Sequence, residues 1–206
     1  MPQDRKHFVK PNDPILIKRA KSVSRKELQT KNIQNLIEKM LDIAFGKRDR
    51  KKAILVGLAA PQVGISRRII LVDIAADGEG KTGDMRVYIN PSITFKSKKE
   101  SQWYEGCWST GNVAGIVLRP DKIKIKALDR NGNRVEEVHT GYTARIFQHE
   151  IDHLNGNEFV THIKNIDDLH WVNDDQWVEY RNREAWRNWL QKCSREKWEK
   201  IKGIQK

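Results

Sequence analysis

The stretch Gln148-His149-Glu150-Ile151-Asp152-His153 contains the pattern His-Glu-x-x-His. On a helix, residues four positions apart lie roughly 40° apart around the axis and about 6 Å apart along it. His149 and His153 can therefore direct two imidazoles at one metal ion, and Glu150 lies where a carboxylate can handle the protons of a water on that ion. We expect this stretch to form a helix that carries part of a metal site.

Apolar residues around the pattern indicate that the helix is buried and runs over residues 141–155. They recur at helical spacing, at Ile146, Phe147, Ile151 and Leu154. Asn155-Gly156 suits the C-terminal end of such a helix. A solvated helical face is the alternative for the pattern alone, but buried His and Glu side chains need partners, which a metal supplies.

Periodicity along the rest of the chain predicts a second long helix and several strands. The helix is expected over residues 24–45, where Ser24 and Glu27 resemble a capping box. Strands are expected over residues 68–75, 86–90, 92–96, 113–118, 122–128 and 134–139. Pro91 is expected to interrupt pairing, and Asn131-Gly132 predicts a hairpin turn. The fold class is α+β, with antiparallel or mixed sheets packed around the central helix and further helices near both termini.

The composition changes late in the chain, which indicates two parts. We expect residues 1–165 to form the catalytic domain and residues 166–206 to form a basic, Trp-rich extension, helical and docked on that domain. Residues 181–206 hold nine Lys or Arg and three Asp or Glu, which is half of the net charge of +12. One amphipathic helix is expected there, with a stripe formed by Trp186, Trp189, Leu190, Cys193 and Lys197.

The basic balance of 39 Lys and Arg against 27 Asp and Glu favours a polyanionic partner such as nucleic acid, a ribosome or anionic lipid, and a solvated lysine-rich surface is the alternative. No apolar run approaches the roughly 18 residues that span a membrane. Residues 1–10 lack the apolar segment of a secretory signal. We expect a cytoplasmic protein with no membrane partner and no specific DNA target. Cys107 and Cys193 are expected to be a ligand and a bystander, not a disulfide.

Three separated blocks resemble the peptide deformylase family in order and spacing. They are Gly57-Leu58-Ala59-Ala60-Pro61-Gln62-Val63-Gly64, Glu105-Gly106-Cys107-Trp108-Ser109 and the stretch 148–156. Further agreement comes from Asn90-Pro91, Arg119-Pro120 and Gly141-x-x-Ala144-Arg145. The resemblance covers roughly residues 13–163. It implies a metal-dependent hydrolase that removes the N-formyl group from the formylmethionine of nascent peptides and releases formate.

The family resemblance implies that Cys107 is the third metal ligand, beside His149 and His153. A small buried core residue is the alternative for Cys107 alone. A thiolate with two imidazoles leaves one tetrahedral position open and suits a borderline or soft divalent ion. We expect one such ion, Fe(II) in the cell, with Zn(II), Ni(II) or Co(II) possible in the isolated protein.

The resemblance also implies roles in catalysis. Glu150 accepts a proton from the attacking water and returns it to the leaving amine. The Gln62 side-chain amide and the Trp108 backbone N–H donate hydrogen bonds to the developing oxyanion. Glu105 and Arg119 are expected to form an ion pair that supports the cysteine loop.

Substrate contacts are expected from four further residues. Gly57 and Gly106 have no side chain, so a peptide backbone can come close to them. Tyr142 and Ile146 share the helix face of His149 and are expected to line the methionine pocket, with a plain core role as the alternative.

Three positions depart from the family pattern: Leu55 replaces the usual first glycine, Trp108 a leucine, and Gly111 a common proline. They leave the metal ligands in place but bear on peptide specificity. The alternative functions are a related metal-dependent amidase or peptidase with another N-acyl substrate, and a ribosome- or RNA-binding protein with a vestigial site. For a ribosome-bound enzyme, contacts from the basic tail to phosphate would make the attraction salt-dependent.

Overall fold

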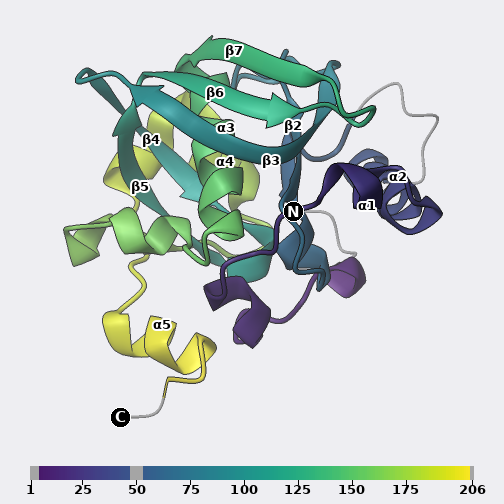
Figure 1. The fold of residues 1–206 in the computed structure, drawn as a ribbon. Helices are drawn as coiled ribbons and strands as arrows, with labels where there is room; N and C mark the ends of the chain where they lie inside the picture. Colours follow the sequence, from purple (N-terminus) through teal and green to yellow (C-terminus); the bar gives the residue numbers. More distant parts are fainter. Residues whose placement is uncertain (1–4, 47–52, 205–206) are drawn as a thin grey trace.

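The computed structural model describes residues 5–46 and 53–204. Its strands form two antiparallel sheets, one in the order β1-β2-β3-β6-β7 and one in the order β4-β5-β8. The strands are β1 (Gly57–Ala59), β2 (Ile69–Asp73), β3 (Met85–Lys96), β4 (Glu100–Gly106), β5 (Val113–Pro120), β6 (Lys122–Leu128), β7 (Arg134–Thr140) and β8 (Leu169–Trp171). The helix α3 (Gly141–Leu154) contacts strands of both sheets and lies at the centre of the molecule (Figure 1). The expected α+β class is confirmed.

The helix α3 is the one that the His-Glu-x-x-His pattern predicts. It begins directly after β7, at Gly141, whose positive φ of 56° favours glycine. Its apolar side chains pack against the five-stranded sheet in a cluster that includes Phe147 and Leu154 from the helix and Ile70 and Tyr88 from the sheet. Burial on this side fixes the rotation of the helix, and with it the direction of both histidines.

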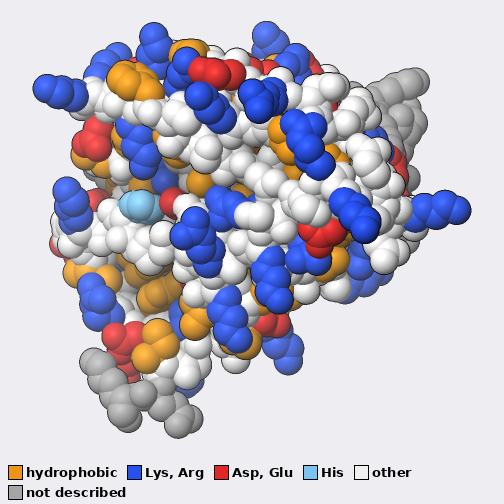
Figure 2. Space-filling view, in the orientation of Figure 1, with side chains coloured by type: hydrophobic (Ala, Val, Ile, Leu, Met, Phe, Trp, Pro, Cys, Tyr) orange, Lys and Arg blue, Asp and Glu red, His pale blue; other side chains and the backbone are white. Residues whose placement is uncertain are grey.

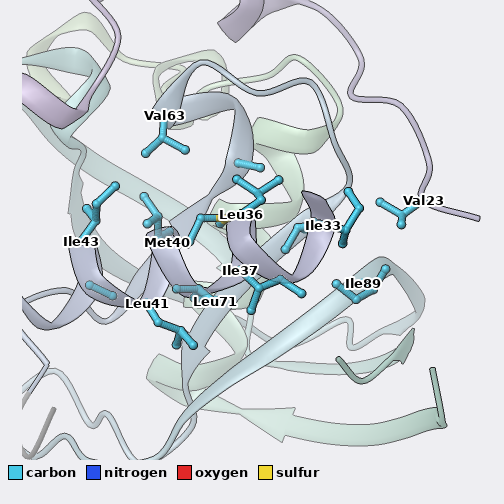
Figure 3. Close-up of a cluster of buried hydrophobic side chains, with 14 of the residues drawn as sticks. Val23, Ile33, Leu36, Ile37, Met40, Leu41, Ile43, Val63, Leu71 and Ile89 are labelled. Carbon is cyan, nitrogen blue, oxygen red and sulfur yellow. The ribbon is translucent and has the colours of Figure 1, made fainter. Parts of the chain in front are cut away.

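Residues 24–45, where one helix was expected, form two helices, α1 (Arg25–Leu28) and α2 (Lys31–Phe45). The capping box at Ser24 and Glu27 is confirmed, with bonds of 3.1 and 2.8 Å, and Thr30 begins the second helix. The buried face of α2 packs on β2 and β3, as Figure 3 shows for Leu36, Ile37, Met40, Leu71 and Ile89. This second core anchors the N-terminal helices to the large sheet.

Pro91 interrupts the pairing of β3 with β6, as expected, but it does not separate two strands, because β3 is a single strand from Met85 to Lys96. The pairing of β3 with β6 shifts its register between Ile89 and Ser92, so the proline falls in a bulge. Asn90 has a positive φ of 52°, and its side-chain amide exchanges two hydrogen bonds with the Val23 backbone. The hairpin at Asn131-Gly132 joins β6 and β7 as expected.

The prediction of a single amphipathic helix near the C-terminus is wrong. The segment instead contains α4 (Trp177–Arg181), the 3-10 helix η7 (Asn182–Asn188) and α5 (Arg195–Ile201). Leu190, placed on the expected apolar stripe, is 90% exposed. Trp177, Trp186 and Trp189 come from different short elements and pack with Tyr180 in one cluster against β5.

The same segment also adds β8 to the small sheet, where it pairs with β5. Neither β8 nor the strands β1 and β4 was predicted. No helix within residues 5–46 and 53–204 combines the length and the apolar character that crossing a membrane requires.

Candidate metal centre

Three side chains from two elements converge beside the centre of the fold. Cys107 follows β4 directly, and His149 and His153 lie one turn apart on α3. Their ligand atoms all lie within 4.8 Å of one another, and Cys107 Sγ is 3.3 Å from His153 Nε2. Ligands on a tetrahedral zinc are separated by roughly 3.5 Å, given metal–sulfur and metal–nitrogen bonds of about 2.3 and 2.0 Å. The three residues therefore fit a single divalent ion.

Glu105 determines which nitrogen of His149 faces the ligand cluster. His149 Nδ1 lies 2.9 Å from Glu105 Oε2, so the imidazole donates there and Nε2 remains for a metal. Such a carboxylate behind a ligating histidine fixes the ring orientation and makes the ligand more basic.

Two buried arginines hold the Glu105 carboxylate. Arg119 donates to both of its oxygens at 2.6 and 2.9 Å, which confirms the expected ion pair. Arg145 donates to Oε1 at 2.7 Å, and Arg119 also reaches Asp152 at 2.7 Å. Neither the partnership of Arg145 nor that of Asp152 was predicted, although both residues lie on the metal-binding helix. The Arg145–Glu105 and Arg119–Asp152 pairs join that helix to the small sheet, and the Arg119–Glu105 pair joins β5 to β4 within the sheet.

The electrostatic surroundings of Cys107 favour the thiolate. Burial opposes ionisation, but the neighbouring His153 and His149 hold the pKa of the thiol well below its usual value. The same thiolate raises the pKa of both imidazoles, against the opposing effect of their burial. A divalent cation replaces those protons naturally, since it needs a thiolate and neutral imidazoles as ligands.

Glu150 is a buried carboxyl group beside this cluster. Burial raises its pKa to about 7, although His149 and His153 oppose the rise. Among the described residues, its Oε2 atom has no hydrogen-bond partner. A buried carboxyl with a pKa near neutrality and a free oxygen is suited to accept and donate protons.

Gln62 is held so that its amide N–H points at the metal centre. It lies in the 3-10 helix η3 (Ala60–Val63), after the short strand β1. The backbone N–H of Ala59 donates to Gln62 Oε1 at 2.6 Å, and Gln62 Nε2 then lies 3.1 Å from Cys107 Sγ. The side chain is buried, so this orientation is fixed by its own loop.

A cavity of about 970 Å³ opens onto these residues. Every candidate substrate-contact residue lines it: Gly57, Gly106, Tyr142 and Ile146, together with Gln62 and Trp108. His149 and Glu150 also line it. The loop at residues 78–82 forms another side, and Gly78 lies directly against the Tyr142 ring.

The two glycines leave room for neighbouring side chains of the protein itself. A Cβ on Gly57 would collide with the Glu150 carboxylate and come within 2.8 Å of Ile146. A Cβ on Gly106 would come within 2.7 Å of the Trp177 ring. Glycine at residue 57 is therefore needed to let Glu150 take its position, a role that the sequence did not indicate.

The departures from the family pattern also have defined places. Leu55 is buried in the core against α2 and lines the cavity. The Trp108 indole stacks on Phe8, with ring centroids 5.4 Å apart. Gly111 has φ 70° and ψ −122°, a conformation that proline cannot adopt. Cys107 and Cys193 are both free, as expected.

A thiolate, two histidines one helical turn apart and a buried glutamate beside them define a metal-dependent hydrolase of the His-Glu-x-x-His class. Residues 5–168 match the model of the polypeptide deformylase family. The chain belongs to this family.

Relatives and solved structures agree with this assignment. The peptide deformylase of Pelotomaculum thermopropionicum is 41% identical over 159 residues, which cover 77% of this chain and 92% of the relative. That of Carboxydothermus hydrogenoformans is 44% identical over 154 residues, with 75% and 90% covered. A class I type b peptide deformylase from Acinetobacter baumannii with bound Met-Ala-Ser superposes with a TM-score of 0.67 at 35% identity, over 76% of this chain and 96% of that one.

Proposed function

We propose that this chain removes the formyl group from N-formylmethionyl peptides, using one divalent metal ion held by Cys107, His149 and His153. The observation that carries the proposal is the convergence of these three ligands beside the buried Glu150. The Acinetobacter relative with bound Met-Ala-Ser supports a peptide substrate that begins with methionine. We propose Fe(II) as the ion in the cell, with Zn(II), Ni(II) or Co(II) accepted by the same soft donor set.

The residues of the chain divide the reaction between them. When bound, the metal lowers the pKa of a water and polarises the formyl carbonyl. Glu150 takes the proton from the attacking water and returns it to the leaving amine nitrogen. Gln62 Nε2 and the Trp108 backbone N–H donate to the oxygen on which negative charge develops. The products are formate and a peptide with a free amino terminus.

Substrate binding is proposed to use the cavity walls. Ile146 and Tyr142 on α3 would contact the methionine side chain, and the backbone at Gly57 and Gly106 would lie along the peptide. All four line the same cavity as Glu150, which supports this placement.

We also propose that residues 1–165 are the catalytic domain and that residues 166–206 are an extension docked on it. Support comes from β8, which adds to the small sheet, and from the buried aromatic cluster on β5. The buried pair of Lys202 and Glu158, 2.7 Å apart, connects α5 to the segment after α3.

The test is anaerobic purification with metal analysis, followed by a formate-release assay on formyl-Met-Ala-Ser. Glu150→Gln keeps the ligands but removes the proton acceptor, so we expect formate release to fall by about 10²- to 10⁴-fold with metal content retained. Unchanged formate release in this variant would contradict the proposed role of Glu150. Acetyl-Met-Ala-Ser and unblocked Met-Ala-Ser distinguish deformylation from a related amidase or peptidase, which would cleave one of these instead.

The basic surface favours the ribosome as a partner, since nascent formylated chains emerge there. Figure 2 shows Lys and Arg side chains distributed over the visible face, with fewer Asp and Glu between them. Within residues 181–206, part of the positive charge already has partners in the chain: Arg187 binds Glu184, Lys202 binds Glu158 and Lys197 lies over the Trp171 ring. Arg195 and Lys200 on α5 are exposed and supply charge for RNA phosphate.

Ribosome pelleting across a salt series tests this partner. The variant Arg195→Glu/Lys200→Glu should pellet less than the unaltered protein, and the difference should shrink as salt rises. Equal, salt-insensitive pelleting would exclude α5 as the contact. A ribosome-bound deformylase would work in the cytoplasm, which is the location that we propose.

A further inference from the structure

The C-terminal extension forms one wall of the cavity that leads to the metal ligands. Its cavity-lining residues are Trp177, Val178, Arg181, Asn182, Arg183 and Glu184. The match to the family model ends at residue 168, so this wall lies outside the matched part of the chain. Whatever the wall contacts is therefore a property of this chain that the family match does not define.

The helix α4 places this wall close to the reacting centre. The Trp177 ring lies against Gly106, the residue that precedes the metal ligand Cys107. Arg181 follows Trp177 by four positions and so shares its face of α4. The Arg181 guanidinium carbon is 5.3 Å from the centre of the Trp177 ring. The positive charge thus stands over an indole that covers the end of β4.

The charge of Arg181 acts on the interior of the cavity. Tyr104 and Tyr142 both line the cavity, and burial raises the pKa of both phenols. The positive charge of Arg181 opposes that rise at each of them. Arg181 lines the same cavity as Tyr104 and Tyr142, so it can interact with a charged group that enters there.

Within residues 5–46 and 53–204, no carboxylate lies at ion-pair distance from Arg181. Two acidic groups that line the cavity have basic partners elsewhere, since Glu105 binds Arg119 and Arg145, and Glu184 binds Arg187 at 2.8 Å. The guanidinium of Arg181 is thus available to a carboxylate from outside the chain.

The turn after Arg181 is held in a defined conformation. Arg183 and Glu184 both have left-handed backbone angles, with φ of 46° and 57°, which non-glycine residues rarely adopt. Arg187 holds Glu184 through two hydrogen bonds and lies over the ring of the buried Trp186, 4.2 Å from its centre. The buried Trp186 thus anchors the turn that follows α4.

We propose that Arg181 is a specificity residue that binds a carboxylate in the part of the peptide that follows formylmethionine. A guanidinium forms a planar, two-pronged contact with a carboxylate, which suits this role. The preferred substrates would be formylmethionyl peptides with Asp or Glu at the second or third position. The free C-terminal carboxylate of a short peptide offers the same chemistry. This inference rests on the proposed deformylase function.

Matched peptides test the inference and separate the two sources of carboxylate. Formyl-Met-Glu-Ser-amide is compared with its neutral counterpart formyl-Met-Gln-Ser-amide, and formyl-Met-Ala-Ser with its amide. We expect kcat/KM to be roughly three- to tenfold higher for the acidic member. The difference should lie in KM, because the contact stabilises the bound substrate and the transition state equally. In Arg181→Gln this preference should disappear, and Arg181→Lys should keep part of it. Arg134→Gln, which removes the same charge from β7, should keep all of it.

Each result has a defined consequence. A preference in only one pair of peptides supports the inference and identifies the source of the carboxylate. Equal kcat/KM values in both pairs, or a preference that survives in Arg181→Gln, would overturn it.

If no formyl peptide is cleaved, the proposed function fails, but the contact can still be measured. Tryptophan fluorescence of the metal-loaded protein then compares binding of Met-Glu-Ser-amide and Met-Gln-Ser-amide. Tighter binding of the acidic peptide that depends on Arg181 supports the contact, and equal affinities overturn it.

Discussion

At the scale of single residues, Glu105 connects the metal ligands to the rest of the fold. One of its oxygens accepts from His149 Nδ1, and both accept from Arg119. The pKa of Glu105 lies well below its usual value, because the attraction of Arg119 and His149 outweighs the effect of burial. The carboxylate is therefore charged in the folded protein and orients the imidazole whether or not a metal is bound.

We expect Glu105→Gln to weaken metal binding by about 10- to 100-fold, the usual effect of losing a carboxylate behind a ligating histidine. Chelator competition monitored by metal release measures this. The control is Glu136→Gln, which removes a carboxylate from an exposed ion pair with Lys124 on the far strands β6 and β7. Metal affinity that changes equally in both variants would show that Glu105 has no special effect on the site.

The metal ligands could be predicted from sequence because helix geometry relates His149, Glu150 and His153 directly, and the family resemblance supplies Cys107. The residues that hydrogen-bond to these ligands could not be predicted. Arg145 lies four residues before His149, but nothing in helical spacing indicates that the facing strand β4 presents Glu105 to both. Trp177 was missed for the same reason, since its contact with Gly106 joins residues 71 positions apart.

At the scale of elements, the alternation of polar and apolar residues, together with turn residues, was sufficient to predict a strand that has one solvent-exposed face and one buried face. The hairpin of β6 and β7 follows this rule. Helical spacing failed as a predictor in residues 181–206, where the positions of the tryptophans suggested one helix. There the large rings come from short helical and extended pieces and are buried together in one cluster, and this burial outweighs the helical periodicity.

The helix α5 is attached to the body through a buried ion pair, and this attachment gives a second prediction. Lys202 lies 2.7 Å from Glu158, and both side chains are at most 7% exposed. Burial raises the pKa of Glu158, and Lys202 opposes that rise. Lys202→Met leaves the carboxyl buried without its partner, which should reduce the free energy of unfolding by about 3 kcal/mol.

Urea unfolding measures this loss. Lys200→Met, on the exposed side of the same helix, should change stability by less than about 0.5 kcal/mol. The double variant Lys202→Met/Glu158→Met should recover most of the loss, because an apolar pair needs no charge compensation. A loss that the second substitution does not restore would show that Lys202 acts through its other contacts, such as its hydrogen bond to the Pro11 carbonyl, and not through Glu158.

At the scale of the whole molecule, the arrangement of residues 166–206 depends on buried groups, and His170 is one of them. It lies on β8, is fully buried, and its ring nitrogens contact Tyr180, Asp167 and Lys192 at 3.0 to 3.1 Å. Burial, together with the positive charge of Lys192, lowers the pKa of His170 to about 4. The neutral imidazole is therefore the form that the folded protein requires.

The sign of the pH dependence follows from this lowered pKa. As pH falls below about 6.5, His170 becomes protonated in the unfolded chain. In the folded chain it stays neutral until about pH 4. The contribution of His170 to stability is complete above pH 6.5 and is lost between pH 6.5 and 4, by up to about 3 kcal/mol. Acid also displaces metal from the Cys107 site, so the unaltered protein alone cannot isolate this effect.

The comparison with His170→Gln isolates it, because both proteins keep the metal ligands. Urea unfolding at pH 7.5, 6.5, 5.5 and 4.5 should show the variant less stable at pH 7.5, since glutamine fits the imidazole site imperfectly. The gap should narrow with each step in acid, because only the unaltered protein loses the His170 contribution. Stability curves that stay parallel across this range would mean that His170 is protonated equally in the folded and unfolded chains, and that β8 is held by packing without a requirement for a neutral ring.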